Sequence, residues 1–202
     1  MVSALVALAF PARCPGCGAP AEPLCPACRV TARPAPCLGT PAGLAALSVP
    51  FAYEGVVREL VARAKYRNRH AALAWLAAEM VAGLGETGAD CDVVTWAPTT
   101  AARRRARGFD QAEVLARSIG AALHRPVRAQ LRRRSGTPQT GAGRADRAAG
   151  PVFAPIRGLP TGRTILLVDD VVTTGATLRA AAAALARAGA ATVYGTAAAR
   201  RP

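Results

Sequence analysis

The clearest hydrophobic pattern in the chain is a continuous apolar run, Ile165–Val168, that leads directly into two adjacent carboxylates, Asp169 and Asp170. A run of this length, rich in leucine and β-branched residues and followed by a polar loop, predicts a buried central strand. The alanine-rich stretch 178–189 has leucines on one face and a glycine at its end, which predicts a helix. We therefore expect a strand, an acidic pair, a hydroxyl-rich loop and a helix, in that order.

Apolar spacing predicts strands and helices along most of the remaining chain. Segments 47–53, 92–96 and 192–198 are typical of strands, whereas 56–64, 73–84 and 111–123 carry apolar residues at helical spacing. Pro50 limits the first of these strands to the edge of a sheet, because proline has no N–H to donate. The segment between Val127 and Phe153 has no apolar periodicity and predicts a long loop. The chain is thus expected to be an α/β protein.

The acidic pair and the loop 173–177 together have the chemistry of a sugar-phosphate site. Ligands of open α/β sheets bind beyond the carboxyl ends of the strands, which is where the pair stands. The loop offers backbone N–H groups, hydroxyls and a glycine at the positive end of a helix dipole, which suits a phosphate. The carboxylates suit ribose hydroxyls. The alternative is that Thr177 merely caps the next helix, although capping requires one such residue only.

This stretch resembles the phosphoribosyl pyrophosphate (PRPP) motif of the type I phosphoribosyltransferases, in which an apolar strand and an acidic pair precede T-T-G-x-T. The resemblance implies that Asp169 and Asp170 are the catalytic pair that holds the ribose hydroxyls. The residues implied to bind PRPP and its 5′-phosphate are Val171, Thr173, Thr174, Gly175, Ala176 and Thr177. Mg²⁺ would bridge the hydroxyls and the pyrophosphate. Positioning and electrostatics would carry the catalysis, with no protein nucleophile.

Four cysteines near the N-terminus have the spacing of a zinc site. Cys14 and Cys17 form one C-x-x-C pair, Cys25 and Cys28 form a second, and seven residues separate the two pairs. Two such turns provide the four sulfurs of a tetrahedral zinc site. The alternative is disulfide bonding, which a chain without a secretory signal makes less favourable. A segment with so small a core should depend on its metal to fold.

The length of 202 residues accommodates one α/β domain and a small appendage. We expect an N-terminal helix and zinc segment over 1–40 and the main domain over 45–202, joined by a linker rich in proline and glycine. The first ten residues are apolar but too short to span a bilayer, and no other segment is a candidate. We therefore expect a cytoplasmic protein without membrane insertion.

The chain is strongly basic, with a net charge of +14 and only 12 acidic residues. This balance favours anionic partners such as phosphates, nucleic acid or membrane headgroups. A loop is predicted after the strand 92–96, and it contains Arg103, Arg104, Arg105 and Arg107. These arginines would face the same anionic ligand, although the run Arg103–Arg105 is also typical of a solvated face. Lys65 is the only lysine, and it either serves the ligand or lies on the surface.

A wider resemblance joins these features. Two C-x-x-C pairs, a lone lysine, R-G-F-D-Q at 107–111, a downstream Pro-Gln and V-D-D-V-V-T-T-G-A-T occur in the order of the ComF family. The likeness runs over nearly the whole chain. It implies a zinc segment fused to a type I phosphoribosyltransferase-like domain, whose parallel sheet is flanked by helices, and a link in some members to natural competence and DNA uptake. Asp110 departs from the asparagine that is common in the family.

Two functions are consistent with the sequence. The first is an enzyme that binds PRPP or a related ribose phosphate and transfers the phosphoribosyl group to an unknown acceptor. Gln139 and Arg147 match family positions in the segment that, in such folds, closes over the active site. The second is an accessory protein that binds single-stranded DNA, although aromatic residues for base stacking make up only 4% of the chain. The sequence determines neither the acceptor nor the oligomeric state.

Overall fold

The structure is a computed structural model that describes residues 13–21, 23–37, 39–64, 69–85, 88, 90–134, 151–156 and 161–201. The predicted helix over the first ten residues lies outside this part of the chain. So do three of the predicted site residues, Lys65, Gln139 and Arg147. None of the described helices is both long enough and apolar enough to cross a membrane.

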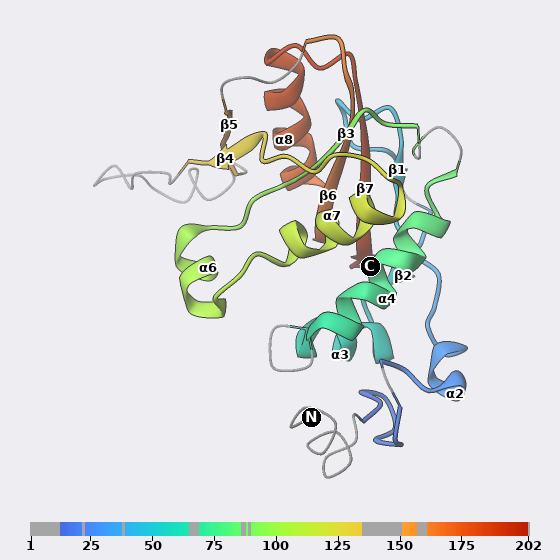
Figure 1. Cartoon of the computed structure of the whole chain (residues 1–202). Coiled ribbons are helices and arrows are strands. Elements are labelled where there is room, and N and C mark those ends of the chain that lie inside the picture. The colour runs from blue at the N-terminus through green and yellow to red at the C-terminus, as the bar shows by residue number, and fades with distance from the viewer. Residues whose placement is uncertain are drawn as a thin grey trace.

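A parallel sheet forms the centre of the molecule (Figure 1). Its strands are β1 (Leu47–Ser48), β2 (Phe51–Ala52), β3 (Val93–Trp96), β6 (Thr164–Val172) and β7 (Thr192–Arg200). The spatial order is β1-β7-β6-β3, and β2 pairs with the far end of β7. In this register Val168 lies between Trp96 of β3 and Thr196 of β7. The prediction that the run before the acidic pair is a central strand is confirmed.

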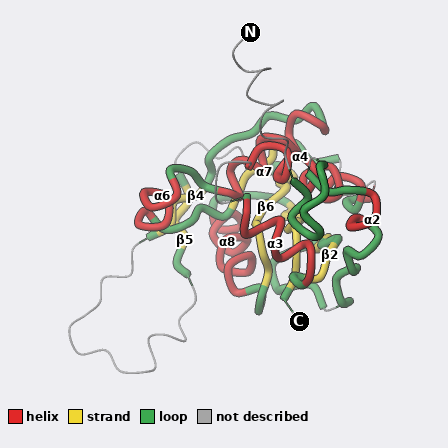
Figure 2. The backbone as a smooth tube through the Cα atoms, turned by 90° about the horizontal axis from the view of Figure 1, so that it is seen from below, coloured by secondary structure: helices red, strands yellow, loops and turns green. Residues whose placement is uncertain are grey.

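Helices cover both faces of this sheet (Figure 2). The helices α3 (Gly55–Arg63), α4 (Arg69–Ala82) and α7 (Gln111–Ala122) lie on one face, and α8 (Ala176–Arg187) lies on the other. Successive side chains of a strand point to opposite faces, so Leu166 and Val168 join the α3–α4–α7 core while Ile165 and Leu167 join the α8 core. Burial on both faces explains the continuous apolar run. The predicted α/β fold with a parallel sheet flanked by helices is confirmed.

The first predicted strand is present but divided. β1 and β2 both pair with β7, and Val49 and Pro50 interrupt them. Proline has no N–H to donate, which accounts for the break at this point. The pair lies at the edge of the sheet, as Pro50 predicted.

Two segments that were predicted to be loops contain helix or strand. The predicted loop after β3 instead contains a helix, α6 (Ala101–Arg107). Thr100 is its N-cap, and the Thr100 Oγ1 accepts a hydrogen bond from the Arg103 N–H. The helix ends at Gly108, which has φ of +76°. This short arginine-rich helix has no buried residues, so its sequence has no helical spacing of apolar residues that would indicate it. β4 (Leu131–Arg133) and β5 (Phe153–Pro155) form an antiparallel pair beside α8. Leu131 and Phe153 anchor that pair in the α8 core.

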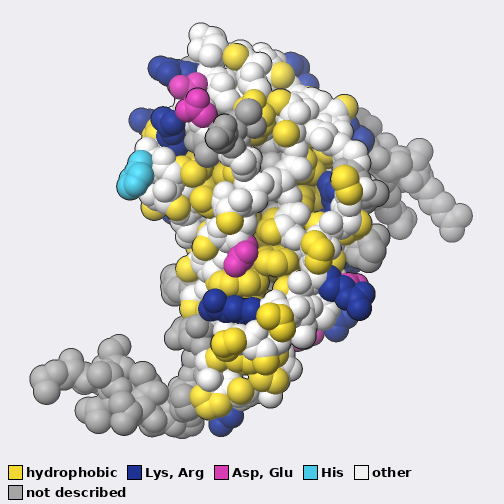
Figure 3. All heavy atoms as spheres, turned by 90° about the vertical axis from the view of Figure 1, so that its right-hand side faces the viewer, with side chains coloured by type: hydrophobic (Ala, Val, Ile, Leu, Met, Phe, Trp, Pro, Cys, Tyr) yellow, Lys and Arg dark blue, Asp and Glu magenta, His cyan; other side chains and the backbone are white. Residues whose placement is uncertain are grey.

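The N-terminal segment packs on the domain. It contains the short helix α2 (Pro26–Arg29), and its Cys14 and Leu24 are buried in the same apolar cluster as Val56 of α3. The chain that follows has no helix or strand among its described residues 30–37 and 39–46, yet it is held in place: the Ala35 N–H donates to the Pro50 carbonyl, and Arg200 donates to the Pro36 carbonyl. The face in Figure 3 shows arginines in small separate groups among apolar side chains.

Candidate functional site

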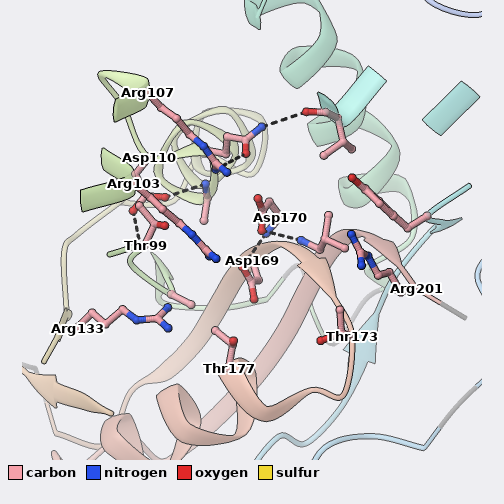
Figure 4. A pocket seen from close by; sticks show the side chains of 16 residues that line it. Thr99, Arg103, Arg107, Asp110, Arg133, Asp169, Asp170, Thr173, Thr177 and Arg201 are labelled. Carbon is pink, nitrogen blue, oxygen red and sulfur yellow. Dashed lines mark hydrogen bonds between the residues drawn. The ribbon is translucent and has the colours of Figure 1, made fainter. Parts of the chain in front are cut away.

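A pocket of about 370 Å³ lies at the carboxyl ends of the parallel strands (Figure 4). Its walls come from the ends of β3 and β6, from Tyr53 after β2 and Arg201 after β7, and from the helices α3, α6 and α7. This is the place at which open α/β sheets bind ligands. The acidic pair lies at its centre.

The acidic pair belongs to the last part of β6 and does not follow it. Backbone pairing with β7 continues to Val172, which faces Arg200. Asp169 is 8% exposed, whereas Asp170 on the opposite side of the strand is half-buried. The Oδ1 atom of each carboxylate accepts a hydrogen bond of 2.8 Å from the N–H of the next residue. The two carboxylates are therefore fixed relative to a rigid strand.

Three carboxylates face this pocket. Burial, and then the neighbouring Asp170 carboxylate, raises the pKa of Asp169 well above its ordinary value. Burial also raises the pKa of Asp110 despite hydrogen bonds from the N–H groups of Thr99 and Ala112. The raised pKa values of Asp169 and Asp110 favour either protons or a bound cation at these two carboxylates. Their hard oxygen atoms are the ligands that Mg²⁺ prefers, so the donor set fits this ion.

The loop after β6 has backbone N–H groups that are available to an anion. It surrounds a small hollow of about 40 Å³, contiguous with the pocket, and all of the predicted loop residues line it: Val171, Thr173, Thr174, Gly175, Ala176 and Thr177. Of the backbone N–H groups from Thr174 to Leu178, only that of Ala176 has an acceptor among the described residues, the Thr174 hydroxyl. Free N–H groups at the start of a twelve-residue helix suit a phosphate.

Gly175, not Thr177, is the residue before the first turn of α8. It has φ of +73°, and Thr177 lies inside the helix, so the alternative in which Thr177 caps this helix is wrong. A Cβ atom at Gly175 would lie 2.8 Å from Cγ of Pro41. Both the backbone conformation and the space therefore require glycine at this point of the loop.

The R-G-F-D-Q sequence forms the corner between α6 and α7. Arg107 donates from Nη1 to Oε1 of Gln111 over 3.1 Å, and Gln111 donates from Nε2 to the carbonyl of Val61 over 3.3 Å. Asp110 is the N-cap of α7, and its other oxygen accepts a 2.8 Å hydrogen bond from the Thr99 N–H. The corner thus ties α3, α6 and the loop after β3 around one wall of the pocket.

Arginines provide positive charge on this wall. Of the four arginines predicted to face an anionic ligand, Arg103 and Arg107 line the pocket, and Arg133 of β4 joins them. Arg104 and Arg105 are exposed on α6 and are not among the residues that line it. In Figure 4 the guanidinium groups of Arg103 and Arg133 point toward the acidic pair from the side of α6.

Sequence reasoning assigned no role to several residues of the pocket, which include Tyr53, Thr99, Asp110, Gln111 and Arg201. A signal for three of them was present. Thr99, Tyr53 and Arg201 follow the carboxyl ends of β3, β2 and β7, by the same rule that located the acidic pair. Asp110 and Gln111 reach the pocket from the start of α7, and their position depends on how α7 packs.

The four N-terminal cysteines form a second candidate site. Their Sγ atoms all lie within 4.8 Å of one another, and those of Cys17 and Cys25 are 3.5 Å apart. All four thiols are free, so disulfides do not join them. A tetrahedral zinc with Zn–S bonds of about 2.3 Å requires sulfurs about 3.8 Å apart, which matches this spacing. The predicted grouping of the four cysteines is confirmed.

The thiols of this cluster differ in acidity. Burial raises the pKa of Cys14, but hydrogen bonds from the N–H groups of Cys25, Cys17 and Gly16 outweigh it and lower the value to about 6. Hydrogen bonds to the other three sulfurs raise the pKa of Cys28 to about 12. Four thiolates in one place therefore require a compensating cation, since the cluster alone readily holds one negative charge.

Comparison with known proteins defines the class of the main domain. Residues 105–201, slightly less than half of the chain, match the family model of the phosphoribosyl transferase domain. This part of the chain is therefore similar to the phosphoribosyl transferase domain, and the match supports a transferase. No curated protein sequence matches the chain.

Three solved structures align with this chain at TM-scores below 0.5. The allosteric regulatory enzyme of purine biosynthesis aligns at 22% identity and a TM-score of 0.48, covering 68% of this chain and 30% of that one. Glutamine PRPP amidotransferase from B. subtilis aligns at 21% and 0.47, with the same coverage. Orotate phosphoribosyltransferase from Aeropyrum pernix aligns at 19% and 0.38, covering 67% and 59%. The chain thus spans 30% of the length of the first two.

Proposed function

We propose that this protein binds PRPP, or a related ribose 5-phosphate, together with Mg²⁺ and transfers the phosphoribosyl group to an acceptor. The observation that carries the proposal is the convergence in one pocket of an acidic pair, a loop of unpaired N–H groups and a set of arginines. These three chemistries match a diol, a phosphomonoester and a pyrophosphate. The ComF family is the particular family that we propose for the chain.

Each part of the ligand has a place in this proposal. The 5′-phosphate binds the loop 173–177, whose residues line the small hollow. Asp169 and Asp170 accept hydrogen bonds from the ribose hydroxyls. Arg103, Arg107 and Arg133 face the pyrophosphate and stabilise the charge that grows on it as it leaves. The described residues therefore hold and orient the ligand while its own pyrophosphate departs.

Mg²⁺ is held in the proposal by the carboxylates of the acidic pair and by ligand oxygens. When bound, it supplies positive charge that lowers the repulsion between the pyrophosphate and these carboxylates. Gln139 and Arg147 are assigned to the segment that closes over PRPP, and Lys65 is assigned to the charge of the ligand. That assignment rests on their family positions, since they lie outside the described residues.

Calorimetry tests the proposal. PRPP with Mg²⁺ is titrated into the parent protein and into Asp169→Asn and Asp170→Asn variants. We expect binding by the parent and a loss of at least about tenfold in each variant, because a hydrogen bond to a charged group contributes about 1.5–3 kcal/mol. Equal binding by parent and variants, or no binding by the parent, would contradict the assignment. A parent that binds is then assayed for pyrophosphate release with a panel of nucleobases.

We further propose that the N-terminal segment binds structural zinc through Cys14, Cys17, Cys25 and Cys28. The sulfur spacing supports this metal. The proposal includes a division into a zinc segment over 1–40 and a transferase domain over 45–202. It also includes a cytoplasmic location, where a reducing environment keeps thiols available for zinc. Metal analysis of the purified protein, with one equivalent of zinc expected, is the direct test.

A second candidate function is nucleic-acid binding, with the pocket used for regulation in DNA uptake. The observation in its favour is the exposed charge next to the pocket, at Arg104 and Arg105 of α6 and at Arg134 after β4. Gel shifts with single-stranded DNA at several salt concentrations separate the two functions. Binding driven by phosphate contacts is strongest at low salt, so no shift under that condition would exclude this candidate.

A further inference from the structure

One end of the pocket has no part in the binding of PRPP proposed above. It is formed by Tyr53, which follows β2, and by Arg201, which follows β7. The Tyr53 N–H donates to the Arg200 carbonyl over 2.6 Å, so the ends of these two strands are held together. In Figure 4, Arg201 lies on the side of Asp170 away from Arg103 and Arg133. The pocket thus has cationic groups at two opposite ends.

The end near Arg201 offers a flat surface and an apolar wall. The central carbon of the Arg201 guanidinium lies 5.0 Å from the centroid of the Tyr53 ring, a cation–π contact. Val61 of α3 and Val171 of β6 also line the pocket, and Tyr53 and Val171 pack against the apolar cluster that contains Val61, which is 3% exposed. Aliphatic side chains next to a stacked guanidinium form a slot suited to a planar ring.

The Arg201 side chain has unused hydrogen-bonding capacity. Among the described residues it forms no hydrogen bond or ion pair, and the cation–π contact leaves its N–H groups available. The same pocket contains the carboxylates of Asp110, Asp169 and Asp170. An anionic ligand would be repelled by these groups unless a cation faced it, whereas a neutral ligand would need no such cation. The forked guanidinium matches a carboxylate.

We propose that Tyr53, Val61 and Arg201 form the acceptor subsite, and that it selects a planar acceptor bearing a carboxylate over its neutral counterpart. This inference rests on the proposed function. A nitrogen of the acceptor attacks C1 of the ribose and forms the new C–N bond. The bond between C1 and the pyrophosphate oxygen breaks, and its electron pair leaves with pyrophosphate. An acceptor N–H gives its proton to water, whereas a pyridine nitrogen carries no proton and becomes a pyridinium.

The test uses pairs of compounds that differ in one charge. Orotate is compared with uracil, nicotinate with nicotinamide, and anthranilate with 2-aminobenzamide, in the full-length protein with PRPP and Mg²⁺. Initial rates of pyrophosphate release give kcat/KM for each compound, and calorimetry gives the Kd of PRPP separately. The variants are Arg201→Gln, Arg201→Lys and, as a control of equal charge change, Arg187→Gln, which is exposed near the far end of α8.

We expect at least one carboxylate to exceed its neutral partner by about tenfold in kcat/KM, as for a charge-assisted hydrogen bond. Arg201→Gln should remove this preference, Arg201→Lys should keep part of it, and Arg187→Gln should keep all of it, with the Kd of PRPP unchanged in all three. If PRPP binds but no pair shows a preference, or Arg201→Gln retains it, the acceptor subsite is wrong. If PRPP does not bind to the parent protein, the proposed function itself fails.

Discussion

At the scale of single residues, Asp169 shows how the pocket keeps a buried carboxylate at a cost to stability. Its carboxylate is buried at the end of a central strand beside the carboxylate of Asp170. Both the burial and this neighbour raise the free-energy cost of its negative charge. The hydrogen bond that it accepts, from the Asp170 N–H, offsets only part of this cost. A carboxylate in this position lowers the stability of the ligand-free protein and favours a ligand that brings a cation. Function and stability are therefore opposed at this residue.

Asp169→Asn should make the ligand-free protein more stable while weakening PRPP binding. Because the pKa of Asp169 is raised in the folded state, its contribution to stability is complete below the unfolded value near 4 and is lost as pH rises through the folded value. Asparagine does not titrate, so the variant should gain free energy of unfolding relative to the parent. This gain is about 1 kcal/mol for each unit by which the pKa of Asp169 is raised, and it should be larger at pH 8 than at pH 5. Urea unfolding at the two pH values measures it.

Asp92→Asn is a control of opposite sign. Hydrogen bonds from the Thr164 N–H, and from Arg163, lower the pKa of Asp92 in the folded state. The stability that it contributes is present above the unfolded pKa and is lost as pH falls through the folded value. This variant should therefore be less stable than the parent at pH 8. A loss of stability in Asp169→Asn at pH 8 would refute the account of the buried carboxylate.

At the scale of elements, the pocket depends on how short segments end. α6 ends at Gly108 in the left-handed conformation, and α7 begins two residues later with Asp110 as its N-cap. This tight corner directs Arg107 back to Gln111 while Asp110 holds the loop after β3. β4 then places Arg133 next to α6 on the pocket wall. Positive charge on this wall therefore comes from two elements, α6 and β4.

Arg133→Gln should reduce the affinity for PRPP by about tenfold and leave that for ribose 5-phosphate nearly unchanged. The reason is that Arg133 faces the proposed pyrophosphate position, which ribose 5-phosphate does not fill. Arg132→Gln is the matched control, because adjacent residues of a strand point to opposite sides and Arg132 is exposed. Calorimetry with both ligands measures the effect. Equal losses for the two ligands would place Arg133 at the 5′-phosphate instead.

At the scale of the whole molecule, the cysteine segment and the main domain share an apolar core. Cys14 and Leu24 are buried in the same cluster as α3, α4 and α7. α3 also provides Val61 to the pocket wall. The state of the cysteine cluster is therefore connected by direct packing to the helix that borders the ligand.

Gly16→Ala tests this connection. A Cβ atom there would lie 2.7 Å from Sγ of Cys28 and 3.1 Å from Cγ2 of Val56, so it would disturb both the sulfur cluster and its contact with α3. Overpacking of this kind costs about 1–3 kcal/mol. We expect lower zinc content and a lower Tm. Gly39→Ala, with no atom within 4 Å of its Cβ, is the control. Unchanged zinc content and Tm in Gly16→Ala would argue against the connection.

Much of the site could be predicted because its residues are close together in the sequence. The strand, acidic pair, loop and helix start lie within 165–178, where apolar pattern and local chemistry act directly. The four cysteines were found by their spacing, and the structure brings their sulfurs together. The helix α6 was missed because helix formation there depends on the caps at Thr100 and Gly108, with no apolar face to indicate it.

The sequence by itself determined the α/β class, the central strand with its carboxylates, the phosphate loop and the cysteine cluster, because each follows from local periodicity or spacing. Only the tertiary structure decided which strand ends face one another. Tyr53, Thr99 and Arg201 lie far apart in the chain and meet the acidic pair because parallel strands place their carboxyl ends at one edge of the sheet. The acceptor end of the pocket therefore arises from strand order, which no local pattern contains.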